Sequence, residues 1–461
     1  MDERFLGCDR GSMNRRALLA ATGMATAAAL AGCTDDVPTN NTTEELPETP
    51  NETPKEPEGS LPEGTPSSPN ERLGELVAGN AGFAVDLHDR LTAGEDADNV
   101  FVSPYSISVA LAMTYAGAGG DTETAMRETL GFSLREETHP AFAELQNQLD
   151  DRATTDAQGG SDSDDGEVDA FQLAVANALW GAAEYPFAEE YLDLVDEHYN
   201  GGFNEADFAN DPEVERERIN EWVAESTEDR IEDLIPEDAL SPQTVLVLTN
   251  AIYFMAGWQL EFDPEETTEA AFSTLDGSES AVSMMEQNLR TNYADLPGAQ
   301  AIELPYVGGE VSMVLIVPDQ GEFEAIQAEL SGSTLFGVFE ALGDASGDLR
   351  MPKFEYEFDT ELSKVLTDMG MEAAFGPGAD FTNMVDSGGG PGIDDVFHKA
   401  FVSVDEEGTE AAAATSVSMI ESAPAASFDL TVDRPFLFCI RDRPTDAVLF
   451  LGRVTDVGAA Q

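Results

Sequence analysis

Basic residues are scarce in this chain of 461 residues, which carries 22 lysines and arginines against 91 aspartates and glutamates. Only four lysines occur, at positions 55, 353, 364 and 399, and the formal net charge is −69 at pH 7. Without a basic patch to meet phosphate groups, nucleic-acid binding is excluded. The acidic excess is spread along the whole sequence, which indicates a solvated acidic surface. In multimolar salt the Debye length falls to about 3 Å or less and screens this charge, so we expect a salt-loving host.

Cysteine and histidine are also rare. The three cysteines, Cys8, Cys33 and Cys439, are too few and too dispersed for a framework of structural disulfides, and Cys439 is predicted to be a buried, inert thiol. The four histidines have no local spacing typical of a metal pair, and the sequence contains no G-x-S-x-G, H-E-x-x-H or C-x-x-C motif. The sequence therefore predicts no enzyme, no metal site and no cofactor.

An apolar run near the start follows Asn14-Arg15-Arg16, which resembles a twin-arginine export signal. The run, residues 17–32, is about 16 residues long, whereas a bilayer-spanning helix needs about 20. It ends in Leu30-Ala31-Gly32-Cys33, which is similar to a lipobox, so Cys33 is the expected lipidation site and residues 1–32 the expected signal peptide. The alternative is an uncleaved anchor helix. Both interpretations predict an extracellular protein held at the outer face of the cell membrane.

The next segment, residues 33–70, consists largely of Pro, Thr, Glu, Asn and Ser. Because it offers little apolar surface to bury, it is predicted to be a disordered acidic tether. Residues 71–461 remain for a folded domain.

Apolar periodicity in this domain predicts helices over residues 73–91 and 106–116. The continuous apolar run 244–254 predicts a central strand covered on both faces. Residues 301–306 and 311–318 predict a hairpin, and residues 349–358 a single strand. Helices segregated from mostly antiparallel strands indicate an α+β fold.

A long loop lies between the strand-like runs 397–404 and 435–440, and it begins with Gly408 and a series of small residues. Such loops are usually functional. From Thr409 onward one alternating face holds only residues that can be buried, ending at Met419, and no proline or inward charge occurs before Glu421. Extended from Thr409 to Ser422, the loop would span roughly 46 Å. This pattern points to a protease inhibitor that traps its enzyme by inserting its own loop into a sheet.

Several motifs in this order resemble those of the serpin family over residues 71–458. They are the segments 99–106, 249–258, 397–400, 406–414, 434–438 and 450–454. The resemblance implies a fold of three β-sheets and about nine helices with an exposed reactive-centre loop. It also implies a suicide-substrate mechanism, in which the protease cleaves the loop, forms an acyl-enzyme and is displaced as the loop enters the large sheet. The chain is thus identified as a monomeric, exported and lipid-anchored member of archaeal, halophile type.

The same resemblance assigns roles to individual residues. Ser103, Asn250 and His398 would form a hydrogen-bonded shutter that keeps the sheet closed, and Trp258 would lie at the breach where insertion begins. The loop hinge comprises Glu406, Gly408, Thr409, Glu410, Ala411, Ala412, Ala413 and Ala414.

Counting along the hinge places the scissile bond at Ser422-Ala423, with Glu421-Ser422 as the alternative. A small residue at the bond suits a subtilisin-like or elastase-like serine protease, whereas Glu421 would suit a glutamate-specific enzyme. No Arg or Lys occurs between Glu407 and Asp433, which argues against trypsin-like targets. The competing hypothesis is a non-inhibitory serpin that acts as a carrier, chaperone or storage protein.

Overall fold

The computed structural model describes residues 60–68, 70–93, 99–153, 171–199, 202–376, 378–386, 390–409 and 426–458. The chain divides into two units, Met1–Lys55 and Glu56–Gln461, and every described residue belongs to the second unit. The expected signal peptide, Cys33 and most of the expected tether therefore lie outside the described residues. None of the helices in the described part is both long enough and apolar enough to cross a bilayer.

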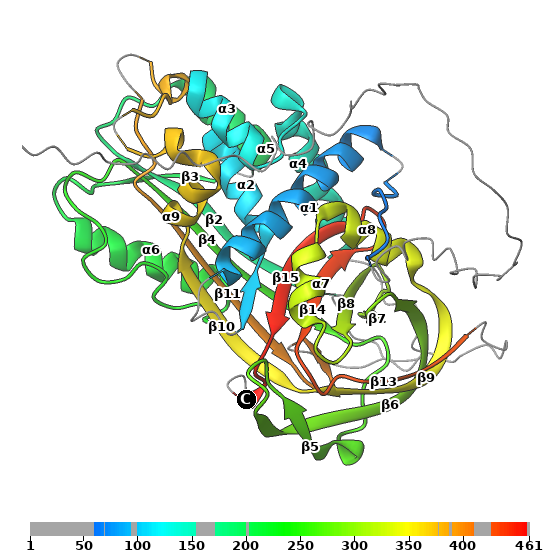
Figure 1. Ribbon diagram of the computed structural model, residues 1–461. Helices are drawn as coiled ribbons and strands as arrows, with labels where there is room; N and C mark the ends of the chain where they lie inside the picture. Colours follow the sequence, from blue (N-terminus) through cyan, green and yellow to red (C-terminus); the bar gives the residue numbers. More distant parts are fainter. Residues whose placement is uncertain are drawn as a thin grey trace, which may run out of the picture. The chain divides into compact units, whose positions relative to one another are not determined.

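The described residues form nine α-helices (Figure 1): α1 (Glu71–Thr92), α2 (Pro104–Tyr115), α3 (Gly120–Thr129), α4 (Thr138–Ala153), α5 (Glu189–Tyr199), α6 (Pro212–Ser226), α7 (Phe323–Glu329), α8 (Gly332–Ala341) and α9 (Ser363–Leu366). Caps determine where several of them begin. The side chain of Asn70 accepts a hydrogen bond from the Arg72 amide at the start of α1, and Ser331 and Thr334 form a capping box at the start of α8. The predicted helices over 73–91 and 106–116 correspond to α1 and α2.

Fifteen strands are described: β1 (Val100–Val102), β2 (Gln172–Ala182), β3 (Phe203–Ala206), β4 (Leu246–Gly257), β5 (Thr268–Ser273), β6 (Glu279–Leu296), β7 (Ala299–Pro305), β8 (Val311–Pro318), β9 (Gly343–Pro352), β10 (Phe354–Glu361), β11 (Asp395–Val404), β12 (Gly408–Thr409), β13 (Ala426–Thr431), β14 (Phe436–Asp442) and β15 (Ala447–Val454). They pair into a six-stranded sheet with the order β10-β11-β12-β4-β2-β3 and a nine-stranded sheet with the order β1-β15-β14-β8-β7-β6-β9-β13, in which β5 also pairs with β6.

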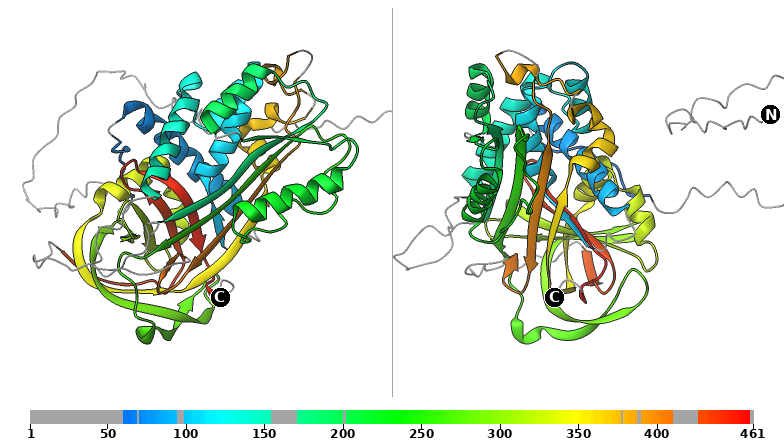
Figure 2. Two further views of the ribbon diagram at one scale, coloured as in Figure 1. Left: turned by 180° about the vertical axis from the view of Figure 1, so that it is seen from behind. Right: turned by 90° about the vertical axis from the view of Figure 1, so that its left-hand side faces the viewer.

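The six-stranded sheet lies between two layers of helices. Figure 2 shows α6 against one face and the helices of the α1–α2 side against the other. On the α6 face, Trp180 of β2 and Val247 of β4 pack with Ile219 and Val223 of α6. On the opposite face α2 is buried over its whole length, from Pro104 to Tyr115. Because β4 is covered on both sides, its sequence is an unbroken apolar run, as predicted for residues 244–254.

The nine-stranded sheet turns around the long strand β6. The first part of β6 pairs with β5 and β9, and its last residues pair with β7. Two regions of this sheet thus share one strand, and together with the six-stranded sheet they correspond to the three sheets expected.

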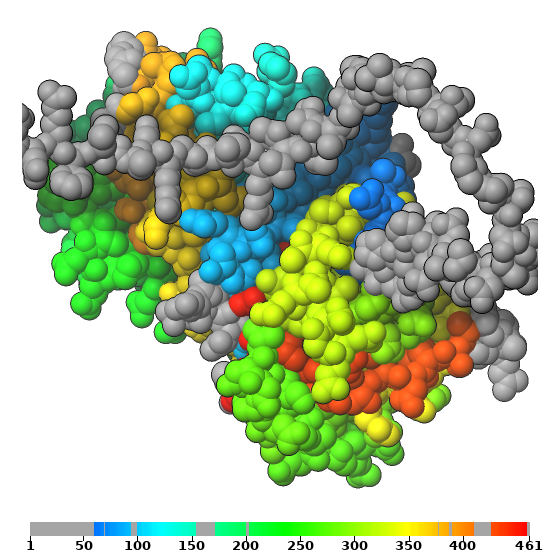
Figure 3. Space-filling model, in the orientation of Figure 1, coloured from blue at the N-terminus to red at the C-terminus, as the bar shows by residue number. Residues whose placement is uncertain are grey.

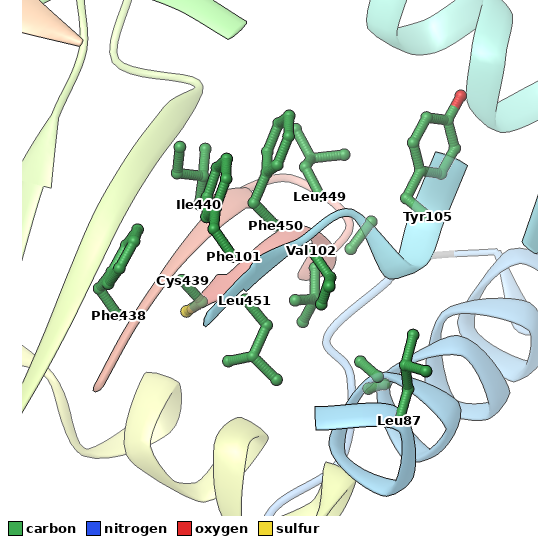
Figure 4. Close-up of a cluster of buried hydrophobic side chains, with 14 of the residues drawn as sticks. Leu87, Phe101, Val102, Tyr105, Phe438, Cys439, Ile440, Leu449, Phe450 and Leu451 are labelled. Atoms are coloured by element: carbon green, nitrogen blue, oxygen red, sulfur yellow. The ribbon is translucent and has the colours of Figure 1, made fainter. Parts of the chain in front are cut away.

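Large side chains on the adjacent strands β1, β15 and β14 form a buried cluster (Figure 4). The Phe101 ring stacks on Phe450, with 4.9 Å between ring centroids, and on Phe438, with 5.6 Å. Cys439 lies in the same cluster and is 1% exposed, and burial raises the pKa of its thiol to about 12. The prediction of a buried thiol is confirmed.

Two expectations about local structure change. The single strand predicted over residues 349–358 is wrong, because β9 ends at Pro352 and β10 begins at Phe354 in the other sheet. Proline lacks the amide that would continue the ladder, so the chain leaves one sheet there and enters the other.

Residues 60–68, expected within the tether, pack on the domain, and Leu61 is only 3% exposed. Residues 60–68, which precede the expected domain start at residue 71, are therefore packed against the domain.

Candidate functional site

The candidate site is the seam between β4 and β11 in the six-stranded sheet. The two strands pair in parallel from Asp395 opposite Val247 to Phe401 opposite Tyr253. Beyond Tyr253 they separate, and the two-residue strand β12 fills the gap. Thr409 pairs with Ala256 on one side and with Val404 on the other. The first residues of the predicted loop thus already lie between the strands that an inserting loop would part.

Gly408 and Thr409 are fitted closely into this position. Gly408 has a φ of +157°, and a Cβ there would lie 2.2 Å from the carbonyl oxygen of Ala256, so only glycine fits without a shift. Thr409 is 1% exposed, and its hydroxyl lies 2.8 Å from the hydroxyl of Tyr306 in a buried hydrogen bond. Its side chain faces the interior, as the alternation of the loop predicts.

The turn that leads to β12 is held by Trp258 and by the carboxylate of Asp405, which belongs to the turn. The Trp258 amide donates to the Glu407 carbonyl at 2.8 Å, and the indole N–H donates to the Asp405 carbonyl at 3.0 Å. The Asp405 side chain accepts from the Glu407 amide at 2.9 Å. The Trp258 ring stacks on Tyr306, with 4.7 Å between ring centroids. Trp258, the residue predicted for the breach, therefore lies beside the turn that leads into β12.

Glu406 joins this turn to the neighbouring strands. Its carboxylate accepts hydrogen bonds from Lys353 at 2.6 Å and from Thr267 at 2.7 Å. Burial by itself would raise the pKa of Glu406, but the hydrogen bonds from Lys353 and Thr267 outweigh it and lower the pKa below its ordinary value. The side chain is therefore a buried, paired anion at neutral pH.

A buried polar group closes the middle of the seam. The side-chain oxygen of Asn250, on β4, lies 2.5 Å from the Nδ1 of His398, on β11. The Asn250 amide donates to Ser106 of α2 at 2.8 Å and to Asn177 of β2 at 2.5 Å. Asn250 is fully buried and His398 is 1% exposed. Two of the predicted shutter residues, Asn250 and His398, are thus in direct contact across the seam.

Ser103, the third predicted shutter residue, does not reach this group. Its hydroxyl donates to the Leu449 carbonyl at 2.7 Å and accepts from the Ser106 amide at 3.1 Å, so it caps the start of α2. The serine that contacts Asn250 is Ser106, one turn further along the helix. Residues three apart share a helix face, so the sequence could have offered both serines as candidates.

Sequence reasoning also missed Asn177, Tyr306, Lys353 and Thr267. Each lies on or beside a strand that is remote in sequence, and no local motif marks it. Among the other predicted site residues, Glu410, Ala411, Ala412, Ala413, Ala414, Glu421, Ser422, Ala423 and Cys33 lie outside the described residues.

The side chains of the seam favour a role in a conformational change over a role in catalysis. Burial lowers the pKa of His398 to about 3, so its imidazole is neutral and its role in the seam is that of a hydrogen-bond partner. The described part of the chain contains no group of three or more His, Cys, Asp or Glu side chains placed to hold a metal ion. The seam is closed by the backbone ladder between β4 and β11 and by the Asn250–His398 contact, and β12 parts the two strands at one end.

Comparison with known proteins defines the class. Residues 78–457 match the family described as serpin (serine protease inhibitor). The chain is 37% identical over 391 residues to an uncharacterized serpin-like protein of Methanosarcina acetivorans, covering 82% of this chain and 87% of that protein. It is 35% identical over 398 residues to antithrombin-III of Mus musculus, covering 85% and 83% respectively.

Solved structures agree on the fold. Human thyroxine-binding globulin complexed with thyroxine has a TM-score of 0.71 and 29% identity, covering 84% of this chain and 99% of that one. Maspin has a TM-score of 0.75 at 22% identity, covering 84% of this chain and all of that one. The predicted serpin fold is confirmed, and the chain belongs to the serpin family.

Proposed function

We propose that this chain inhibits an extracellular serine protease by the suicide-substrate mechanism. The observation that carries the proposal is the position of Gly408 and Thr409, already paired between β4 and β11. Insertion would only have to extend a strand that has begun, so no new entry point is needed. The hydrogen bond between Thr409 and Tyr306 fixes the register of that start.

Extending this register predicts where each loop residue would go. If Thr409 stays opposite Ala256 and the strands remain antiparallel, Ala411 would lie opposite Phe254 and Ala413 opposite Ile252. Both partners face the main core, where little space is free. Small side chains suit these positions because they enter without overpacking.

The same register brings Thr415 opposite Asn250, in the middle of the seam. Insertion would therefore separate Asn250 from His398. The new strand would satisfy the backbone groups of both neighbours along β4 and β11, which offsets the lost polar contact. The shutter thus acts as a closure that the inserting strand can replace.

Cleavage would release the loop for this movement. The protease's serine hydroxyl attacks the carbonyl carbon of Ser422, the Ser422–Ala423 bond breaks, and the amine of Ala423 leaves with a proton. The remaining ester links Ser422 to the protease, and insertion of the preceding residues displaces the enzyme before water hydrolyses that ester. If the bond is Glu421–Ser422 instead, the same steps apply one residue earlier.

The target would be a subtilisin-like or elastase-like protease, because the proposed bond presents Ser422 and lacks a basic residue. The chain would meet it as a monomer outside the cell, exported by the twin-arginine route in a salt-loving host and held at the membrane through Cys33. A Cys33→Ser change should release the protein into the medium in cell fractionation. Retention at the membrane would favour the uncleaved anchor helix.

Trapping can be tested on a denaturing gel. The full chain is mixed with a salt-tolerant subtilisin-like protease in multimolar salt. A band at the summed mass that survives SDS would show the covalent complex. A clipped chain beside fully active protease would contradict inhibition of that target, and the heat stability of the clipped chain then separates the remaining outcomes. A large gain in stability would mean that the loop inserts and the target was wrong, whereas no gain would indicate a non-inhibitory carrier or chaperone.

A further inference from the structure

The described chain begins with a segment without helix or strand, residues 60–68, which lies before the part that matches the family, residues 78–457. We name these nine residues the strap. Figure 1 and Figure 3 show the strap, in blue, beside α8. Leu61 is 3% exposed and joins the main core, so the strap is packed despite its tether-like composition.

Helix α8 is shaped to receive the strap. A Cβ at Gly337 would lie 2.0 Å from the carbonyl oxygen of Pro62, so the close approach depends on glycine at this position. The Gly64 amide donates to the Ser333 carbonyl at 2.8 Å, and the Thr65 amide donates to the Glu340 carboxylate at 3.2 Å. These contacts pair the strap backbone with the first turn and the last turn of α8.

The end of the strap reaches a buried ionic network. Both the amide and the hydroxyl of Ser67 donate to Asp446, in the turn between β14 and β15. The other carboxylate oxygen of Asp446 binds Arg441 at 2.6 Å, and Arg441 binds Glu303 at 2.6 Å. Since Asp446 is 6% exposed, the strap is linked through it to charges inside the domain.

We propose that the strap anchors the preceding part of the chain to α8 and the β14–β15 turn, away from the seam that opens. Its long-range hydrogen-bond partners among the described residues, Ser333, Glu340 and Asp446, belong to neither β4 nor β11. Insertion of a strand moves its neighbours apart by about 4.8 Å. A force along the membrane tether would then act on α8 and the β14–β15 turn, which the proposed insertion leaves in place. The functional part of this inference rests on the proposed loop insertion and anchoring.

Hydrogen exchange on the full chain tests the strap. The amides of Gly64 and Ser67 should exchange at least about tenfold more slowly than an unprotected chain, and Gly337→Ala should remove that protection. The matched control is Gly82→Ala in α1, since a Cβ at Gly82 meets no atom within 4 Å. Each change replaces glycine by alanine inside a helix, so the gain in intrinsic helix propensity is the same. Only the contact with Pro62 distinguishes the two variants.

Equal protection in wild type and Gly337→Ala, with both folded by circular dichroism, would overturn the docking. If Gly337→Ala does not fold, Leu61→Asp replaces it, because that change removes the buried leucine without altering α8. Exchange is then repeated after loop cleavage. Protection within about twofold of the uncleaved chain is expected, and its loss would overturn the separation of strap and seam. A chain that gains no heat stability on cleavage would refute loop insertion while leaving the uncleaved comparison valid.

Discussion

The seam between β4 and β11 and the core between β14 and β15 are both buried, yet they are built differently. The centre of the seam depends on Asn250 and His398, and its end is already parted by β12. The β14–β15 region combines the stacked rings around Phe101 with an ion pair between Glu303 and Arg441. In the proposed insertion, a new strand would replace the ladder between β4 and β11, whereas it would make no pairing with β14 or β15. In the proposed mechanism the seam is thus the part that opens, and the β14–β15 region is the part that keeps its contacts.

The largest expected effect comes from Ala411→Arg. In the proposed register Ala411 enters the core opposite Phe254, which is 1% exposed, so an arginine would bury an unpaired charge. Such a charge costs about 3–5 kcal/mol, which lowers the fraction of trapped protease about a hundredfold or more. The measurement is the ratio of trapped complex to clipped chain on a denaturing gel.

Glu410→Arg is the control for this change, because it places the same group on the opposite face of the strand, opposite Met255. It should leave most of the trapping intact. Equal loss in both variants would mean that the loop does not enter in this register.

In the β14–β15 region, Arg441→Ala should lower the free energy of unfolding by about 3–5 kcal/mol. Burial would raise the pKa of Glu303, but Arg441, together with Asn292 and Arg443, lowers it below its ordinary value, so losing the arginine leaves a buried anion without its main partner. Denaturant unfolding should show the same loss before and after loop cleavage, because the proposed insertion leaves this region unchanged.

Arg350→Ala provides the comparison within the same sheet. Arg350 pairs with Glu286 at the surface, where its side chain is 49% exposed, so the loss should be about 1 kcal/mol or less. An Arg441→Ala loss that vanished in the cleaved chain would contradict the division into fixed and moving parts.

One buried histidine, His398, lies at the seam and another, His88, lies on α1, and acid should destabilise the folded chain equally through both. Burial lowers the pKa of His398 at the seam to about 3, and burial together with Arg453 lowers that of His88 on α1 to about 3. The unfolded chain binds these protons near pH 6.5. Stability is therefore full above pH 6.5 and falls as the pH drops toward 3, by about 1.4 kcal/mol per pH unit for each histidine.

Denaturant midpoints between pH 6.5 and 5, at constant salt, give this slope. Either His398→Gln or His88→Gln should reduce it by about 1 kcal/mol per pH unit on average over this range, because the unfolded histidine is only half protonated at pH 6.5. A reduction in only one variant would show that the other histidine becomes protonated in the folded protein, so that burial differs between the two regions.

Much of this division could be predicted from the sequence. Three features are local sequence patterns: the apolar run of β4, the helix α2, and Gly408 with the small residues that follow it. Each can be interpreted without knowing which distant residues it contacts. The choice between Ser103 and Ser106 could not be made, because it depends on which turn of α2 faces Asn250. The strap was missed because its close contact, between Pro62 and Gly337, joins residues that are far apart in the sequence.

The smallest expected effect concerns the hydrogen bond between Tyr306 and Thr409, where the seam is already open. Tyr306→Phe removes only the hydroxyl and should cost about 1 kcal/mol. Tyr293→Phe, which removes a partly buried hydroxyl from β6, serves as the control. Because Thr409 lies between β4 and β11 before cleavage and would remain there afterwards, the Tyr306→Phe loss should be equal in the uncleaved and cleaved chains. Ala411→Arg should destabilise only the cleaved chain. If Tyr306→Phe also acted only after cleavage, Thr409 would enter the sheet as part of insertion, and the parted end of the seam would not belong to the native inhibitor.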